Sequence, residues 1–553
     1  MNEELSRRAF LQVAALAAAA GCEDAVPPPG DATVDAMRDV PDPMDATAAD
    51  TPDAAEEGWS PVPASTEPDP NPRFAHGVVS GDPLPDAVVL WTRVTPDAGA
   101  MAPVEVRWEL AEDPGFTQNP RGGMARADPS RDFTVKVDAT GLAPARTYYY
   151  RFSALGATSP VGRTRTAPLG ATARLRLAVV SCASYAHGYF FAYRQVARLA
   201  DLDAVVHLGD YIYEYGNGEY GGVRTYDPPT ECRTLADYRR RYAHYRRDPD
   251  VRAVHRQHPM IAIWDDHEFA DNAWQGGAEN HDPATEGRWT DRRAAATQAW
   301  FEWMPTRDSP DGRSWRSLAF GDLAELVLLD TRSWGREEQP AFTDGGVATP
   351  DRQLLGADQE RWLGETVRAS RARWKLVGQQ VMMTRVEQFV NVDQWDGYPA
   401  ARARFFGLLR EMGVSDVVVL TGDIHSSWGA DLVERPRDPM AYDPATGRGS
   451  VGVELVTPAV SAPGFPDLGT SLLTTIRASN PQFKFVDLSR RGFILLDVTP
   501  ERLQAAWHLL DGVSERTART RLGGVLAVRS GRPTLFPESA PAEPRRDAPP
   551  LLP

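Results

Sequence analysis

Four short apolar runs in this sequence each end on side chains that bind metals or transfer protons. The runs and the residues that follow them are Leu175–Val180 with Ser181-Cys182, Ala204–Val206 with the stretch to Asp210 and Tyr213, Met260–Trp264 with Asp265-Asp266-His267-Glu268, and Asp416–Leu420 with Gly422-Asp423-Ile424-His425. In an open α/β sheet, ligands bind in the crevice beyond the carboxyl ends of the strands. We expect the four ends to lie side by side and to surround one point with a thiol, a phenol, imidazoles and carboxylates.

Asp210 is the natural bridging ligand, because it follows the central apolar run and its carboxylate offers two oxygens. Two metals about 3.5–4 Å apart clamp the attacking and the leaving oxygen in phosphoryl transfer. Cys182, Tyr213 and His425 offer softer ligands for one of the metals. Free thiols and phenols have pKa values of about 8.5 and 10, so binding both in ionised form favours a strong Lewis acid. We therefore expect trivalent iron at that position.

The second metal would take oxygen ligands. Asp266 and Asp423 suit a hard divalent ion such as calcium, magnesium or manganese. His267 directly follows one of these ligands, so it can face a leaving group without binding metal. This position makes His267 the candidate general acid.

Each motif taken alone also has a structural explanation. An Asp after a strand often caps the next helix. Cys182 could be a small buried residue, or it could pair with Cys232 in an oxidising compartment. All four motifs in this order, each after an apolar run, are hard to explain by structure alone. We therefore favour the catalytic interpretation.

The composition excludes one class of partner. The chain has 553 residues and a net charge of −16, and this length predicts about two to four domains. Non-specific nucleic-acid binding depends on Lys and Arg side chains that neutralise phosphates. We therefore expect no nucleic-acid partner.

The N-terminus is typical of an export signal. Arg7-Arg8 precede an Ala-rich apolar run that ends at Gly21 and is too short to span a bilayer. Twin arginines favour the export machinery for folded proteins. Cys22 ends a stretch that resembles a lipoprotein cleavage box, although Ala19 stands where Leu is usual. The alternatives are a lipid anchor on Cys22 and an ordinary cleaved signal.

The chain after the signal changes its pattern three times. Residues 23–72 are rich in Ala, Asp and Pro, with Arg38 as their only basic residue, which predicts a disordered acidic linker. Residues 73–168 contain short alternating runs between turns, typical of a small β-sandwich. Residues 173–513 alternate apolar runs with amphipathic stretches, which predicts an α/β domain. Residues 514–553 are rich in Arg and Pro, and we expect a surface-hugging or loose tail.

Five helices are expected in the α/β domain. They are Tyr189–Leu199, Thr234–Tyr245, Asp291–Trp303, Ala357–Ala369 and Ala400–Met412.

The motifs in their order resemble the PhoD-like alkaline phosphatases, which are related to purple acid phosphatases within the calcineurin-like metallophosphoesterases. The resemblance rests on Ser181-Cys182, Gly209-Asp210-x-x-Tyr213, Trp264-Asp265-Asp266-His267-Glu268 and Gly422-Asp423-Ile424-His425. The run from Phe74 to Pro83 and the stretch Leu90-Trp91-Thr92-Arg93 are similar to the start of the family's N-terminal domain. The likeness extends from about Arg73 to Trp507.

The resemblance implies a fold, an activity and a set of ligands. The fold would be an αββα-sandwich metallophosphoesterase domain preceded by a small all-β domain like immunoglobulin or fibronectin modules. The activity would be hydrolysis of phosphate mono- and diesters at alkaline pH at an iron–calcium centre. Carried over by motif, the iron ligands are Cys182, Asp210, Tyr213 and His425, the calcium-side ligands are Asp210, Asp266 and Asp423, and further site candidates are Asn272 and Arg332.

We therefore expect an exported phosphohydrolase, periplasmic, extracellular or held at the cell surface through a lipid anchor. A metal-bound hydroxide would attack phosphorus, and His267 would assist the leaving oxygen. Its substrates would be small phosphate esters, with phospholipids as a further class, and it would contact a membrane only through the lipid anchor. One alternative is a phosphodiesterase of phospholipase D type that acts on lipid head groups. Another is a surface lipoprotein that binds a ligand and keeps an inactive phosphatase fold.

Overall fold

The computed structural model describes residues 58–553, except 70, 341–350, 388–389, 414–415 and 466–468. The expected signal peptide, Cys22 and most of the expected linker lie outside the described residues. No helix within the described ranges is long and apolar enough to cross a membrane.

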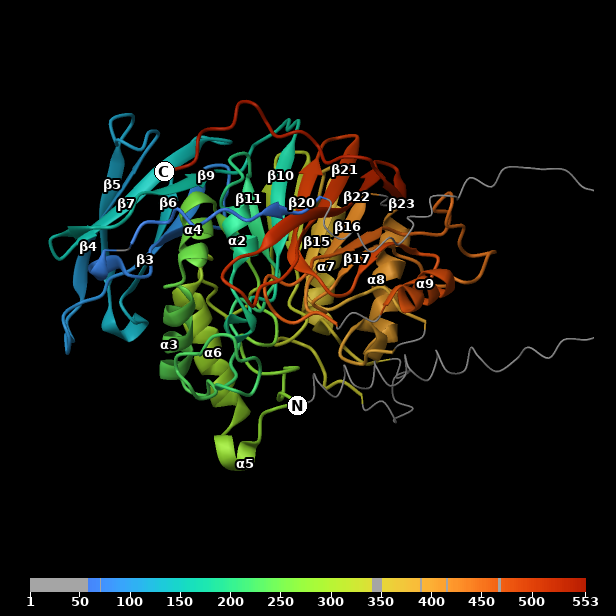
Figure 1. The fold of residues 1–553 in the computed structure, drawn as a ribbon, viewed down its shortest axis with the longest axis horizontal. Coiled ribbons are helices and arrows are strands. Elements are labelled where there is room, and N and C mark those ends of the chain that lie inside the picture. The colour runs from blue at the N-terminus through green and yellow to red at the C-terminus, as the bar shows by residue number, and fades with distance from the viewer. Residues whose placement is uncertain (1–57, 70, 341–350, 388–389, 414–415, 466–468) are drawn as a thin grey trace, which may run out of the picture.

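Two large sheets form the centre of the molecule (Figure 1). The first contains, in spatial order, β1 (Ser60–Pro61), β22 (Arg519–Arg529), β21 (Arg502–Leu510), β20 (Arg491–Val498), β10 (Leu175–Val180), β11 (Ala204–His207), β12 (Met260–Ala262), β2 (Val78–Gly81), β3 (Ala87–Arg93) and β6 (Thr134–Thr140), with β23 (Arg532–Pro537) paired to β22. The second contains β13 (Arg316–Phe320), β14 (Ala324–Leu328), β15 (Trp374–Gln379), β16 (Val417–Thr421), β18 (Val453–Val456), β17 (Ser427–Asp431) and β19 (Phe483–Asp487).

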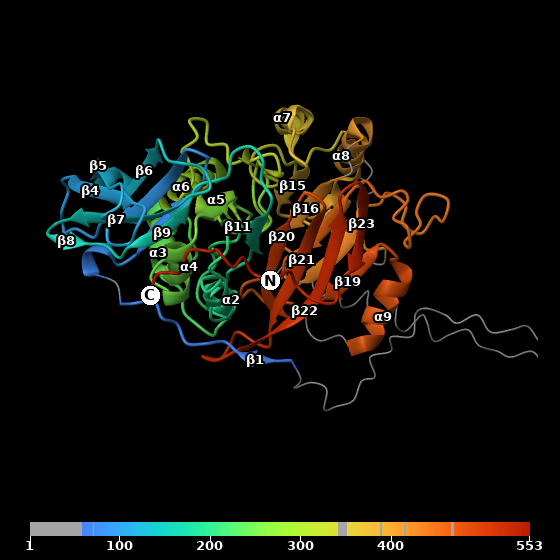
Figure 2. The same ribbon diagram turned by 90° about the horizontal axis from the view of Figure 1, so that it is seen from above.

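The helices of the described residues are α2 (Phe191–Val196), α3 (Leu235–Tyr245), α4 (Pro249–Gln257), α5 (Pro283–Glu286), α6 (Trp289–Trp303), α7 (Gly356–Ala369), α8 (Pro399–Met412) and α9 (Gly469–Ser479). Residues of α2, α4 and α6 pack on the outer face of the first sheet, and residues of α7 and α8 pack on that of the second. Figure 2 shows α7 and α8 along one side of the sheets and α2 on the other. The five expected helices are thus confirmed, with α2 shorter than expected.

The alternation of side chains along β10 explains why this chain forms layers. Leu177 and Val179 pack between the two sheets, together with Leu376 and Leu420 of the second sheet. Ala178 points to the opposite face and packs in the cluster that includes helices α2, α4 and α6. Successive residues of a strand face opposite sides, so a strand that is apolar throughout must be covered on both. The result is two facing sheets between two layers of helices.

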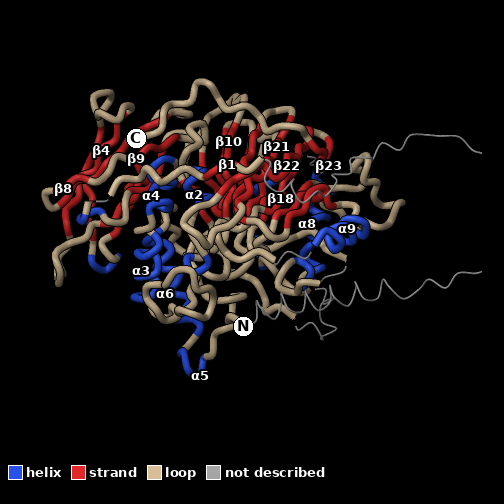
Figure 3. The backbone as a smooth tube through the Cα atoms, in the orientation of Figure 1, coloured by secondary structure: helices blue, strands red, loops and turns tan. Residues whose placement is uncertain are grey.

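The N-terminal β-strands are not an independent unit. β2, β3 and β6 face a smaller sheet of β4 (Val104–Ala111), β5 (Arg121–Ala127), β7 (Thr147–Ala154), β8 (Ala157–Thr158) and β9 (Gly162–Arg165) across a shared apolar core. The pairing of Met260 with Gly81 joins β2 to β12, so one sheet runs through both parts. Figure 3 shows strands across the molecule, from β4 of the smaller sheet to β23 of the first sheet. The all-β character is confirmed, and the likeness to immunoglobulin modules stays a prediction.

Two expectations about the chain ends are wrong for the described residues. Ser60 and Pro61, expected in the disordered linker, pair with β22, and the Glu67 side chain is buried beside Arg252 and Arg256. The expected tail contains β22 and β23, which extend the first sheet. These strands were not predicted, because the segment is rich in Arg and Pro and its apolar residues alternate over only a few positions.

We predict that β22 contributes to stability as a core strand. Leu526 is 4% exposed and packs between the sheets, whereas Leu522 on the same strand is 42% exposed. Leu526→Ala should lower the free energy of unfolding by about 2–5 kcal/mol, because it leaves a cavity in the core. Leu522→Ala, the matched control, should change it by less than about 0.5 kcal/mol. Urea denaturation of the two variants measures both, and equal small effects would restore the interpretation as a loose tail.

Candidate metal centre

Three adjacent parallel strands deliver most of the predicted site residues to one edge of the first sheet. Val180 at the end of β10 pairs with His207 of β11, which pairs with Ala262 of β12. The chain leaves all three strands in the same direction. Cys182, Asp210 and the Asp265-Asp266 pair therefore meet beyond their carboxyl ends, as expected for a ligand site in an α/β sheet.

The fourth run ends at the same place but belongs to the second sheet, so the expectation of four neighbouring strands is wrong. β16 delivers Asp423 and His425 from the facing sheet. Gly422 makes the approach possible, because a Cβ there would lie 2.9 Å from the Cβ of Ser181. Sequence periodicity identifies a strand end but not the sheet to which the strand belongs.

Several site residues have left-handed backbone conformations. The φ angles are 60° at Cys182, 55° at Asp210, 62° at Asp423 and 56° at His425. Such conformations cost about 1–3 kcal/mol each for residues other than glycine and cluster at functional sites. The neighbouring Gly209 has a φ of 107°, and a Cβ there would lie 2.4 Å from the Cβ of Asp265. The sharp turns aim the side chains of successive loops at one point.

The first group of candidate ligands is formed by Cys182, Asp210 and His425, whose ligand atoms lie within 4.8 Å of one another. The Tyr213 hydroxyl joins them, 3.0 Å from Asp210 Oδ2 and 3.1 Å from His425 Nε2. His425 Nδ1 lies 3.1 Å from the carbonyl oxygen of Pro463. A proton on Nδ1 would satisfy that carbonyl and leave the lone pair of Nε2 directed at the group.

Cys182 and Cys232 are both free and buried, so the alternative disulfide between them is not formed.

The second group is formed by Asp265, Asp266 and Asp423, whose carboxylate oxygens also lie within 4.8 Å of one another. Arg332 has a fully buried side chain and donates a hydrogen bond to Asp423. The same guanidinium nitrogen lies 3.5 Å from Asp266 Oδ1. The other terminal nitrogen of the guanidinium, Nη1, donates to both carboxylate oxygens of Asp393, at 2.8 and 2.9 Å. Arg332 thus lies at the site, as expected.

His267 is held by a carboxylate. Its Nδ1 lies 2.8 Å from Glu214 Oε2, and its backbone N–H donates to Asp210 Oδ1 at 3.3 Å. The imidazole stacks on Tyr213, with 4.2 Å between the ring centroids. A proton on Nδ1 is therefore fixed toward Glu214, and Nε2 is the atom left for exchange with a substrate.

Asn272 reaches the site through its backbone. Its N–H donates to Asp266 Oδ2 at 2.6 Å, while its side-chain amide donates to Glu279 at 2.5 Å. In this structure the Asn272 side chain is therefore engaged away from the carboxylates.

Sequence reasoning missed four site residues. Glu268 accepts backbone hydrogen bonds from Asp210, Tyr211 and Asp265, at 3.0, 2.6 and 2.8 Å, and so ties two strand-end loops together. Asp265 and Glu268 belong to the motif Trp264-Asp265-Asp266-His267-Glu268, so their position in that motif could have identified them. The other two are Glu214, which directly follows the motif that ends at Tyr213, and Asp393, whose sequence surroundings offer no signal.

Burial dominates the electrostatics of the site. It raises the pKa of the Cys182 thiol well above its ordinary value, and the nearby Asp210 adds to the rise. It also raises the pKa of Asp210 well above its ordinary value, although His267 opposes the effect. Burial works to lower the pKa of His267, but the carboxylates of Asp266, Glu214 and Asp210 outweigh it and raise the pKa. The site concentrates negative charge in a place that water cannot screen.

This donor set fits metal ions. Buried ionised groups are tolerated when they are paired or coordinate metals. The first group combines a thiol, a phenol, an imidazole and a carboxylate, and the second consists of carboxylates, so the two groups suit ions of different hardness. Asp210, Asp266 and His267 also form a group of their own, which connects the two.

Comparisons with known proteins agree with this site. The model of the PhoD-like phosphatase family matches residues 177–507, and that of the PhoD-like phosphatase N-terminal domain matches residues 60–168. Alkaline phosphatase D of Bacillus subtilis (strain 168) is 38% identical over 470 residues, which cover 80% of this chain and 78% of that protein. A solved structure of PhoD is 35% identical, covers 87% of this chain and 94% of its own, and superposes with a TM-score of 0.78.

The fold and the site together define a hydrolytic enzyme with a candidate metal centre between two sheets. The chain belongs to the PhoD-like phosphatase family, and it is a phosphoric ester hydrolase.

We predict that Glu268 holds the site together through its three backbone contacts. Glu268→Gln keeps one acceptor oxygen and places an amide N–H against a backbone N–H, so it leaves buried donors without acceptors. Each unsatisfied donor costs about 1–3 kcal/mol, and the variant should unfold at a lower temperature. Glu105→Gln, on the exposed side of β4, is the matched control and should not change the unfolding temperature. A Glu268→Gln protein as stable as the control would contradict this role.

Proposed function

We propose that this enzyme hydrolyses phosphate monoesters and diesters at alkaline pH with the help of two unlike metal ions. The observation that carries the proposal is the pair of connected ligand groups beyond β10, β11, β12 and β16. One group contains the soft and phenolic donors, and the other contains carboxylates alone. A site for a single ion would not need both kinds.

Cys182, Asp210, Tyr213 and His425 would hold ferric iron. Asp266 and Asp423, with Asp210 between them and the iron, would hold calcium, or magnesium or manganese in its place. Such a pair of cations supplies Lewis acidity that draws charge from the phosphoryl oxygens and makes water nucleophilic.

The chain's own residues would orient the substrate and move one proton. Arg332 is directed at the carboxylates of the second group, where its guanidinium can also donate to a phosphoryl oxygen. His267 Nε2 would give its proton to the leaving oxygen. Glu214 would keep the imidazole in place through its contact with Nδ1 during that transfer. Arg332, His267 and Glu214 are buried, and their burial limits the access of bulk water to the reacting atoms.

We further propose that the protein is exported. Arg7-Arg8 and the apolar run after them support the twin-arginine route, and Cys22 supports attachment of a lipid at the cell surface or in the periplasm. The acidic stretch that follows would then separate the enzyme from the membrane.

The first test of this proposal is metal content together with activity. The metal-loaded enzyme should contain iron and one divalent ion, and it should show a visible absorption band, because a phenolate and a thiolate can donate charge to ferric iron. It should hydrolyse both an aryl phosphate and a bis-aryl phosphate. An active, colourless sample without iron by elemental analysis would disprove the iron assignment.

Asp266→Ala should remove one of the two metal ions and leave the other in place. The variant loses a carboxylate of the second group, so the divalent ion should be lost together with activity, while iron and its absorption band remain. Asp291→Ala, at an exposed position of α6, is the matched control and should keep both ions. Retention of the divalent ion by Asp266→Ala would show that this residue is not its ligand.

His267→Ala should keep both metals but lose rate according to the leaving group. General acid assistance is worth about 10²–10⁴-fold, so hydrolysis of an alkyl phosphate should fall by a factor in that range. Hydrolysis of an aryl phosphate should fall less, because an activated phenolate leaves with little protonation. The ratio of kcat values for the two substrates in the same variant measures the effect. An equal loss on both would exclude the acid role, and loss of metal would make His267 a ligand.

A further inference from the structure

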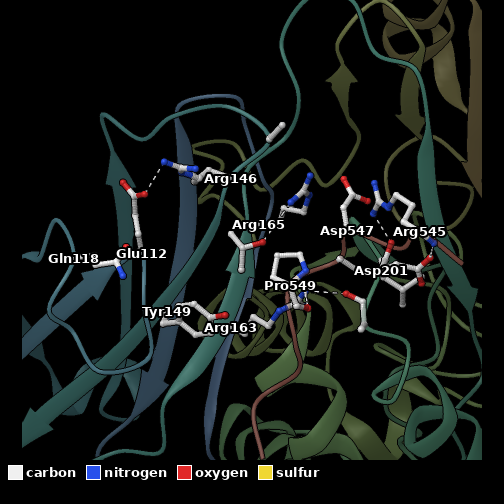
Figure 4. A pocket seen from close by; sticks show the side chains of 15 residues that line it. Glu112, Gln118, Arg146, Tyr149, Arg163, Arg165, Asp201, Arg545, Asp547 and Pro549 are labelled. Atoms are coloured by element: carbon white, nitrogen blue, oxygen red, sulfur yellow. Dashed lines mark hydrogen bonds and ion pairs between the residues drawn. The ribbon is translucent and has the colours of Figure 1, made fainter.

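A pocket of about 430 Å³ lies at the end of β10 and β11 opposite to the candidate metal centre. Its walls come from three parts of the chain (Figure 4). β7 and β9 of the N-terminal part form one wall, and the turn at residues 200–202 before β11 forms the second. The C-terminal segment at residues 545–549 forms the third wall. Its volume is in the range of sites for small molecules.

The pocket is rich in guanidinium groups, although the chain as a whole is acidic. Arg146, Arg163 and Arg165 line it from the N-terminal part, and Arg545 lines it from the C-terminal segment, on the other side of the view in Figure 4. Arg146 is half-exposed and pairs with Glu112 at 2.8 Å. The other three guanidiniums are largely buried.

Arg163 carries a buried charge that the described part of the chain does not neutralise. The residue is 2% exposed, and its contacts are the carbonyl oxygens of Gln257, Ala200 and Pro549, at 3.1, 2.8 and 3.3 Å. No carboxylate among the described residues forms an ion pair with it, and its Nε has no hydrogen-bond partner there. Burial lowers the pKa of Arg163 to about 10; the nearby Tyr149 opposes this fall, and the charges of Arg165 and Arg545 add to it. A buried cation without a counter-ion is costly.

Asp547 also lines the pocket, and two further carboxylates beside it are already shared between other cations. Asp203 pairs with Arg165 at 2.9 Å and with Arg545 at 3.1 Å. Asp201 pairs with Arg176 at 3.1 Å and accepts the backbone N–H of Arg545 at 2.7 Å. Four guanidinium groups line the pocket against three carboxylates, Glu112, Asp201 and Asp547. Positive charge therefore still exceeds negative charge in the pocket, and an anion from solution would offset the excess.

We propose that this pocket binds a dianionic phosphoryl group, as inorganic phosphate or as the phosphate end of a small ester. Guanidinium groups bind phosphate through parallel N–H donors. Arg163, Arg165 and Arg545 approach the pocket from two sides, so one phosphoryl group between them would accept hydrogen bonds from different parts of the chain. Tyr149 offers an aromatic wall for the organic part of an ester. The pocket is separate from the reaction site and does not depend on metal loading.

Bound phosphate would stabilise the packing of the C-terminal segment against the rest of the protein. The pocket connects the N-terminal part, the turn before β11 and the C-terminal segment, which is otherwise held by contacts such as that of the Leu552 N–H with Gln257 at 3.0 Å. A ligand that binds only the assembled form shifts the equilibrium toward it. The backbone amides of the C-terminal segment should therefore open less often when phosphate is present.

Hydrogen exchange of the metal-loaded full chain tests the proposal, because it shows which peptides phosphate protects. Inorganic phosphate should slow exchange in peptides that cover residues 543–553, in addition to any effect at the metal centre. Arg163→Met should require about tenfold or more phosphate for the same protection, because a charged hydrogen-bond donor is lost. It should hydrolyse an aryl phosphate at the wild-type rate.

Arg126→Gln, on the exposed side of β5, is the matched control and should keep the protection. Arg165→Gln decides the question if Arg163→Met does not fold, and it should show the same weakening. Sodium chloride at equal ionic strength should give no protection. Equal protection by sodium chloride, full protection in both pocket variants, or protection confined to the peptides of the metal centre would overturn the proposal.

Discussion

The structure depends on the burial of many acidic groups at one point. Asp210, Asp265 and Asp266 are at most 3% exposed, and Cys182 is fully buried beside them. Moving an isolated ionised carboxylate out of water costs far more than a folded protein can supply, so such groups are stable only with compensating charge. Arg332 provides one fixed cation, and the proposed metals would provide the rest. The strand ends, the tight turns and the buried guanidinium all serve this one requirement.

The backbone brings the acidic groups together at a measurable cost. Cys182 and Asp210 leave their strands in left-handed conformations that disfavour ordinary residues. Gly209 and Gly422 allow loops of neighbouring strands and of the two sheets to approach more closely than any side chain would permit. The apolar core between the sheets holds the strands in register, and Glu268 ties two of the loops through their backbone N–H groups. Strain at the site is therefore offset by packing and hydrogen bonds around it.

Much of this arrangement could be predicted from the sequence, because strands and their ends have local signals. The four apolar runs, the main helices and the site residues Cys182, Asp210 and His425 were found in this way. What was missed depends on contacts between distant segments. Nothing near β16 in the sequence tells which sheet it joins, and Glu214 supports His267 from 53 positions away. β22 was missed because its charged and glycine residues resemble those of a tail, although its pairing with β21 makes it part of the sheet.

The two ends of the same parallel strands have opposite electrostatic character, and this follows from how the chain is connected. At the carboxyl ends of β10 and β11, the loops carry the acidic groups of the candidate metal centre. At the amino ends, Arg176 and the turn before β11 meet the N-terminal part and the C-terminal segment, which bring Arg163 and Arg545. A phosphoryl group would be attracted to the first end by Arg332 and the proposed metal ions, and to the second end by the guanidinium groups of Arg163, Arg165 and Arg545. One sheet would thus separate the place where the enzyme releases phosphate from the pocket that we propose retains it, because the length of the strands keeps the two apart.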